Sequence, residues 1–153
     1  MNGLKLFALL YLFAVSGAAC AQATVLQCSA KLDGVPHSLK LFFADGNVTG
    51  FDYSSTNPKY GEDCEVEAHE GQDGRTTASV WKRSPGGVLV SVFDPPADSK
   101  QHAYQADVKI EQFDRGYRLT ILSEPEPKIC ALHGYIAPVV VIAPTKSRCK
   151  LQE

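Results

Sequence analysis

From residue 24 onward, apolar and polar residues alternate in short runs that are typical of β-strands, with no sustained helical period. The runs are rich in Val, Ile, Phe, Tyr and Thr, and Gly, Pro, Asp and Asn separate them. This pattern predicts an all-β fold: a single antiparallel β domain, built as a sandwich or an up-and-down barrel of about 8–10 short strands. The predicted strands are Val25–Leu32, Ser38–Phe43, Val48–Tyr53, Cys64–His69, Thr76–Lys82, Val88–Phe93, Tyr104–Gln112, Tyr117–Leu122, Cys130–Tyr135 and Val139–Ile142.

Side-chain alternation also predicts the register of two hairpins. In the first hairpin, the apolar faces of the two strands meet only if the loop has an odd number of residues. We expect a three-residue loop, Asp45-Gly46-Asn47, in which Gly or Asn takes the left-handed conformation. The faces brought together are Leu39, Leu41 and Phe43 on one strand and Thr49, Phe51 and Tyr53 on the other.

The second hairpin requires a loop with an even number of residues. With four loop residues, from Phe113 to Gly116, Glu111 lies opposite Arg118, and such an exposed cross-strand pair contributes about 0.2–1 kcal/mol. The apolar residues that then face each other are Val108 and Ile110 with Leu119 and Ile121.

The segment from Val139 to Ile142 is apolar at every position and lies between Pro138 and Pro144. A strand that is apolar on both faces is central in a sheet or covered by other segments. We therefore expect a buried strand, pinned by a neighbouring disulfide. The alternative is an exposed edge that binds a partner, and the two prolines argue against it because neither can donate a backbone hydrogen bond.

Residues 1–23 have the plan of a secretory signal peptide. Lys5 supplies a positive charge, residues 6–15 are apolar, and small residues lead to Ala21-Gln22-Ala23. The apolar run is far shorter than the roughly 20 residues that a membrane-spanning helix needs. We expect cleavage after Ala23 or Ala21, which leaves residues 24–153 as one exported domain, periplasmic or secreted.

A second interpretation of the same site is a lipoprotein, cut before Cys20 and lipidated on its sulfur. Ala18-Ala19-Cys20 resembles a bacterial lipobox, but Gly17 stands where that family usually has Leu or Val. The disordered tether expected of a lipoprotein is also missing, since a strand-like run begins at residue 24. Cleavage by signal peptidase is the preferred prediction, and a lipid anchor at Cys20 is the alternative.

Four cysteines stay in the exported domain in either case, because cleavage removes Cys20 and lipidation consumes it. In an oxidising compartment we expect them to form two disulfides. Of the three possible pairings we favour Cys28–Cys64 and Cys130–Cys149, since each joins neighbouring segments of a meander. A metal site is not predicted, because there is no C-x-x-C and no His at ligand spacing from a Cys.

The charge distribution argues against two classes of partner. The chain has 15 Lys and Arg residues against 17 Asp and Glu, and its formal net charge is −2. The basic residues are scattered, without a stripe or a cluster. We therefore expect neither a nucleic-acid surface nor a patch for anionic lipid.

No catalytic motif is present, so we predict neither an enzyme nor a cofactor. The H-E-x-x-H spacing and the G-x-S-x-G elbow are both absent. The run Glu62, Asp63, Glu65 and Glu67 could supply a pair of catalytic carboxylates, but acidic residues near a turn are more often solvated. Trp81 is expected in the core. The histidines are His37, His69, His102 and His133.

Three irregular loops, at 54–63, 94–103 and 123–128, suit the recognition of another protein. The second carries Pro95 and Pro96 and the third carries Pro125 and Pro127, and prolines lower the entropy lost when a loop binds. The same prolines could instead set turns and block edge pairing. The candidate partner-binding residues are Glu62, Asp63, Asp94, Pro95, Pro96, Glu124 and Glu126.

An exported, disulfide-bonded β domain of this size is similar in its general plan to periplasmic lysozyme inhibitors and to immunity proteins. The similarity is architectural, and the Ser-Gly-x-x-Tyr signature of C-type lysozyme inhibitors is absent. It implies a binding or inhibitor protein whose partner is an exported hydrolase or toxin. The alternatives are a small-molecule-binding β-barrel, a secreted enzyme, and an envelope structural domain without a ligand.

Overall fold

A computed structural model describes residues 24–71, 78–93, 104–114, 116–122, 130, 136–143 and 148–152. Within these ranges ten strands form two antiparallel sheets, as the alternation predicts. The four-stranded sheet has the order β1-β2-β3-β4, and the six-stranded sheet has the order β10-β9-β8-β7-β6-β5. The strands are β1 (Thr24–Leu32), β2 (Val35–Ala44), β3 (Asn47–Asn57), β4 (Glu62–His69), β5 (Ala78–Ser84), β6 (Gly87–Phe93), β7 (Tyr104–Phe113), β8 (Gly116–Leu122), β9 (Val139–Ile142) and β10 (Lys150–Gln152).

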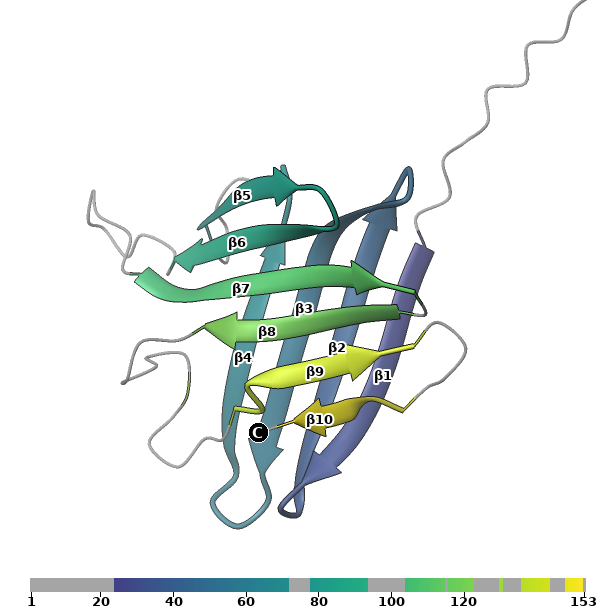
Figure 1. Ribbon diagram of the computed structural model, residues 1–153. Coiled ribbons are helices and arrows are strands. Elements are labelled where there is room, and N and C mark those ends of the chain that lie inside the picture. The colour runs from purple at the N-terminus through teal and green to yellow at the C-terminus, as the bar shows by residue number, and fades with distance from the viewer. Residues whose placement is uncertain are drawn as a thin grey trace, which may run out of the picture.

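The two sheets pack face to face, and the strands of one run across those of the other (Figure 1). Of the two predicted architectures, the sandwich is the one found. Along β2 and β6, for example, alternate residues enter the space between the sheets and are buried there. Trp81 packs against this core from β5 and is partly buried, in agreement with its predicted place. The largest fully buried side chains include Tyr53, Phe51, Leu39, Leu41, Ile110, Leu119 and Ile142.

The β2–β3 hairpin has two of its three predicted facing pairs, Leu39–Tyr53 and Leu41–Phe51, but a different turn. Leu41 faces Phe51 across the two strands, as expected. The turn contains two residues, Asp45 and Gly46, with φ angles of 50° and 76°. The predicted three-residue loop is therefore wrong. A two-residue turn with positive φ at both positions matches the twist of the flanking strands, and an Asp-Gly pair favours it.

A β-bulge restores the side-chain alternation that this even turn would otherwise break. Phe42 pairs with Gly50 and Phe43 pairs with Val48, so Thr49 is the extra residue on β3. One extra residue shifts the register by one and returns the rest of β3 to the predicted face. Phe43 consequently faces Val48 and not Thr49.

The β7–β8 hairpin confirms the predicted register. Phe113 and Gly116 are themselves paired, so the loop has two residues instead of four, and the register is unchanged because both numbers are even. The predicted residues are all register partners: Val108–Ile121, Ile110–Leu119 and Glu111–Arg118. The ion pair of Glu111, however, is with Lys109 on the same strand, at 2.7 Å.

Strand β9 lies inside the six-stranded sheet, between β8 and β10, so the exposed-edge alternative is wrong. Val140 and Ile142 are buried in the core, whereas Val139 and Val141 face outward and are partly exposed. The sequence does not predict β10, because its three residues are too few to show an alternation.

The disulfides are Cys28–Cys149 and Cys64–Cys130, with Cα–Cα distances of 5.3 Å and 4.3 Å, and the predicted pairing is wrong. The sheet order rules out Cys28–Cys64, because β1 and β4 are opposite edges of the four-stranded sheet. Each bond instead ties one edge of that sheet to a later segment of the chain. Two disulfides indicate an oxidising, extracytoplasmic environment.

Backbone contacts accompany both disulfides. The amide of Cys149 donates to the carbonyl oxygen of Ser29 at 3.1 Å, and Cys130 forms an isolated β-bridge with Cys64. Cys130 is also the only residue of the predicted strand Cys130–Tyr135 that the structure describes. Next to each disulfide, therefore, an edge strand of the four-stranded sheet has a backbone contact with a later segment of the chain.

A buried polar network joins the four-stranded sheet to the segment that leads into β9. The Tyr53 hydroxyl accepts a hydrogen bond from the backbone N–H of Ala137 at 2.7 Å, and it also hydrogen-bonds Nδ1 of His37 at 2.9 Å. His37 is only 2% exposed, and this burial lowers its pKa. Burial between the sheets therefore favours the neutral form of this histidine.

His37 predicts a loss of stability in mild acid. A base whose pKa is lower in the folded chain takes up protons preferentially when the chain unfolds. The stabilisation that depends on neutral His37 is fully present above about pH 6.5, the ordinary pKa of histidine. As the pH falls towards the lowered pKa of the folded chain, the free energy of unfolding decreases by at most about 1.4 kcal/mol per pH unit. Urea unfolding of the protein and of His37→Gln, at about pH 7.5 and about pH 5.5, measures this. Between the two pH values, His37→Gln should lose less unfolding free energy than the unchanged protein, and equal losses would contradict the prediction.

Candidate functional site

The outer face of the four-stranded sheet carries polar side chains in rows that cross its strands. One row consists of Gln27, Lys40, Asp52 and Glu67, which are register partners on β1 to β4. On the edge strand β4, acidic residues alternate with buried ones and point outward: Asp63, Glu65 and Glu67. Negative charge therefore gathers on the β4 side of this face.

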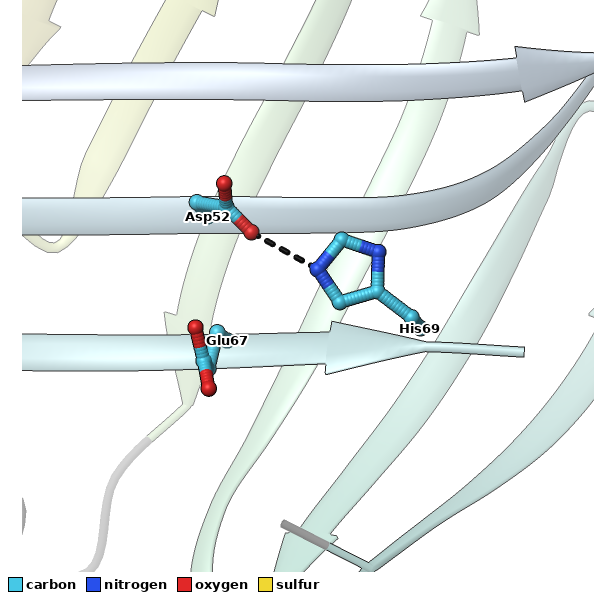
Figure 2. A group of neighbouring side chains, drawn as sticks. All are labelled: Asp52, Glu67 and His69. Atoms are coloured by element: carbon cyan, nitrogen blue, oxygen red, sulfur yellow. Dashed lines mark hydrogen bonds and ion pairs between the residues drawn. The ribbon is translucent and has the colours of Figure 1, made fainter. Parts of the chain in front are cut away.

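His69 ends β4 on the same face, beside Asp52. Nε2 of His69 lies 2.8 Å from Oδ1 of Asp52, and the two side chains are 25% and 33% exposed (Figure 2). Glu67 lies next to this pair, and one ligand atom from each of the three residues lies within 4.8 Å of the others. The group brings one imidazole nitrogen and two carboxylates together at the surface.

Gly50 and Phe42 set the position of the His69 ring. His69 is the register partner of Gly50, and its ring lies so close over this glycine that a Cβ there would overlap Nδ1. Phe42 meets the ring edge to face, with the two centroids 4.8 Å apart. The missing side chain at Gly50 thus allows the imidazole to lean across β3 towards Asp52.

The β3–β4 turn is a second ordered surface, and we call residues 58–61 the hairpin tip. The carbonyl oxygen of Asn57 accepts hydrogen bonds from the amides of Tyr60 (3.3 Å) and Gly61 (2.8 Å). The side-chain oxygen of Asn57 accepts one from the amide of Lys59 (3.0 Å). Pro58 restricts the backbone at the first tip position. Tyr60 is 49% exposed, and the Lys59 ammonium lies 4.9 Å from its ring centroid.

The hairpin tip projects beyond the six-stranded sheet (Figure 1). The β3–β4 ladder continues up to the pair Asn57–Glu62, and the Cys64–Cys130 disulfide lies two residues further along β4. The predicted irregular loop over 54–63 is therefore wrong, since most of it is strand. What the sequence presents as a long loop is a short turn on a rigid base.

Of the predicted partner-binding residues, the structure describes Glu62 and Asp63, which begin β4. Asp63 is exposed on the outer face, and Glu62 is half-buried at the base of the hairpin tip. The remaining predicted positions lie outside the described residues: Cys20, Asp94, Pro95, Pro96, Glu124 and Glu126.

The two histidines that the structure describes lie on opposite faces of the four-stranded sheet. His37 is buried between the sheets, and His69 is on the outer face. His102 and His133 lie outside the described residues. Within the described ranges, therefore, the histidines are not brought together in one cleft.

Two surface grooves are lined by residues other than the hairpin tip and His69. The first, of about 150 Å³, lies beside the β2–β3 turn, where Arg83 donates to the carbonyl oxygen of Val48 at 3.0 Å and pairs with Glu70. The second, of about 470 Å³, is lined in part by Lys31 and Arg148. The Arg83 guanidinium is already bound to Val48 and Glu70, so at the first groove it connects the two sheets.

Sequence patterns alone do not reveal the group of Asp52, Glu67 and His69. The alternation shows only that Glu67 and His69 share a face of β4. Asp52 joins them because the register pairs it with Glu67, and that register depends on a turn whose length the sequence leaves open.

Comparisons of the chain with protein families, with characterised proteins and with solved structures find no match. The described residues include no helix long and apolar enough to cross a membrane. The chemistry of the surface residues is therefore the basis for a functional proposal.

Proposed function

We propose that this chain is an exported binding protein of the inhibitor type, which recognises another protein through its hairpin tip. The observation that carries the proposal is the ordered exposure of Tyr60. Its turn is held by three hydrogen bonds to Asn57, and a disulfide lies at the base of the hairpin. An aromatic side chain presented on such a base is typical of a protein-recognition surface.

Rigidity of the hairpin tip favours binding because little conformational entropy is left to lose. Tyrosine adds a large, stiff contact surface with a hydroxyl group that can hydrogen-bond a partner. Truncation of such a residue at the centre of an interface commonly costs about 2 kcal/mol or more. The prolines that support recognition in the sequence lie elsewhere, but Pro58 gives the hairpin tip the same advantage.

The charge behind the hairpin tip favours a basic partner. Asp63 and Glu65 are exposed on the outer face of β4, and they follow the tip directly along the strand. Complementary charge steers association and disfavours wrong partners. An enzyme that acts on an anionic cell-wall polymer is expected to have such a basic surface. We therefore favour, within the general proposal, a periplasmic inhibitor of a cell-wall hydrolase or an immunity protein against an exported toxin.

A small-molecule-binding barrel is less well supported. Such a carrier needs a wide interior, whereas large side chains such as Phe51 and Tyr53 are fully buried between the sheets.

Replacing Tyr60 with Ala is expected to weaken partner binding by about tenfold or more, which corresponds to about 1.4 kcal/mol. Titration against a panel of basic cell-wall hydrolases and exported toxins, with inhibition as the readout, measures the effect. Val80→Ala is the matched control, because Val80 is a similarly exposed apolar residue on the six-stranded sheet (50% against 49%). Equal losses in the two variants, or no inhibition of any panel member, would refute the proposal.

A further inference from the structure

We infer that Asp52, Glu67 and His69 form a binding site for a divalent transition-metal ion, with Zn²⁺ as the ion that suits the donor set. The site is independent of the hairpin tip, because it lies at the other end of the β3–β4 ladder. It combines residues from two consecutive strands, with Asp52 on β3 and both Glu67 and His69 on β4.

The donor chemistry fits zinc. One imidazole nitrogen and two carboxylate oxygens are ligands that Zn²⁺ accepts, and three protein ligands leave a fourth position for water. Calcium and magnesium favour sites made only of oxygen ligands, with about six or more positions filled. Two carboxylates next to a neutral imidazole carry two negative charges, which match the charge of the ion.

The distances fit as well. In a tetrahedral zinc site with bonds of about 2.0–2.2 Å, donor atoms lie roughly 3.4 Å apart. Nε2 of His69 and Oδ1 of Asp52 are 2.8 Å apart, and all three donors lie within 4.8 Å of one another. Small rotations of the side chains would bring the three donors to the required separation.

Binding would replace a hydrogen bond with a metal ion. The ion takes the place between His69 and Asp52 where a proton now lies. The neutral imidazole then carries its one proton on Nδ1 and offers the lone pair of Nε2. The proton moves from Nε2 to Nδ1 of the same ring, and no other covalent change is needed.

The surroundings hold the ligands in place before the ion arrives. Gly50 leaves room for the imidazole over β3, and Phe42 packs on its edge. Asp52 and Glu67 are direct register partners on neighbouring strands. Ligands carried by strands are more precisely positioned than ligands on loops. Lys40 is the register partner of Asp52 on β2, so one positive charge accompanies the two carboxylates and the site keeps a net negative charge.

Calorimetric titration of the purified, oxidised protein with ZnCl₂ in a chelator-free buffer tests the site. We expect one ion per chain, and a loss of affinity of about 100-fold in His69→Gln, the change that removes the nitrogen donor. Glu67→Gln should weaken binding by about tenfold or more. Glu65→Gln is its matched control, because it removes the same charge from the same face of β4, and we expect its affinity within about twofold of the unchanged protein.

Two outcomes would overturn the inference: no zinc binding by the unchanged protein, or equal losses in Glu67→Gln and Glu65→Gln, which would mean diffuse attraction to surface charge. Thermal unfolding gives a readout that does not depend on calorimetry. Zinc should raise the Tm of the protein and of Glu65→Gln but not that of His69→Gln, since an ion bound only by the folded state stabilises it. The Tm values without zinc verify that each variant is folded.

Discussion

Replacement of both Cys28 and Cys149 with serine is expected to lower the free energy of unfolding by about 5 kcal/mol. The bond joins residues separated by 121 positions, so its loss frees a very long loop in the unfolded chain. The bond between Cys64 and Cys130 spans 66 positions, and its removal should cost about 4 kcal/mol. Domains are stable by only about 5–15 kcal/mol, so either variant should lie close to the unfolding threshold.

Equilibrium urea unfolding of the two double variants measures these losses. A loss below about 1 kcal/mol for Cys28→Ser/Cys149→Ser would contradict the entropic argument. Peptide mapping without reduction provides the control on the pairing itself. The peptide that contains Cys28 should be joined to the one that contains Cys149, and a peptide joining Cys28 to Cys64 would refute the observed arrangement.

Tyr53→Phe is expected to lower the free energy of unfolding by about 3 kcal/mol. The change keeps the buried ring but removes a hydroxyl that bonds both the Ala137 amide and His37. Each buried polar group that loses its partner costs about 1–3 kcal/mol. Because the hydroxyl connects β3 to the segment before β9, its loss weakens the contact between the two sheets.

Tyr60→Phe is the matched control for this change, since it removes the same hydroxyl from an exposed ring. We expect it to change stability by no more than about 0.5 kcal/mol. Urea unfolding at about pH 7.5 compares the two variants. Equal effects would show that burial of the Tyr53 hydroxyl does not contribute as argued.

Local alternation predicts most strands and both hairpin registers because burial of one face has a strict period of two. It also predicts that Leu41 faces Phe51. It does not distinguish a three-residue loop from a two-residue turn with a bulge, because the two solutions have the same parity. The bulge at Thr49 is visible only in the structure.

Long-range pairing is where the sequence is least informative. The spacing of the cysteines favours disulfides between neighbours on a single meander, but the strands divide into two sheets, and each bond joins an edge of one sheet to a distant segment. The candidate sites lie within one hairpin, and the sequence misses them for a different reason. Asp52 meets His69 through strand register, and the hairpin tip is ordered by contacts to Asn57, neither of which has a compositional signal.

The most direct test of protein recognition by the hairpin tip is photo-crosslinking in cells that export the protein. A photoreactive residue replaces Tyr60 in one variant and Asp45 in another; Asp45 lies on the β2–β3 turn at the opposite end of the four-stranded sheet. We expect a discrete crosslinked complex with one basic exported protein from position 60 and none from position 45. Crosslinks of equal yield from both positions, or none from position 60, would contradict the proposed function.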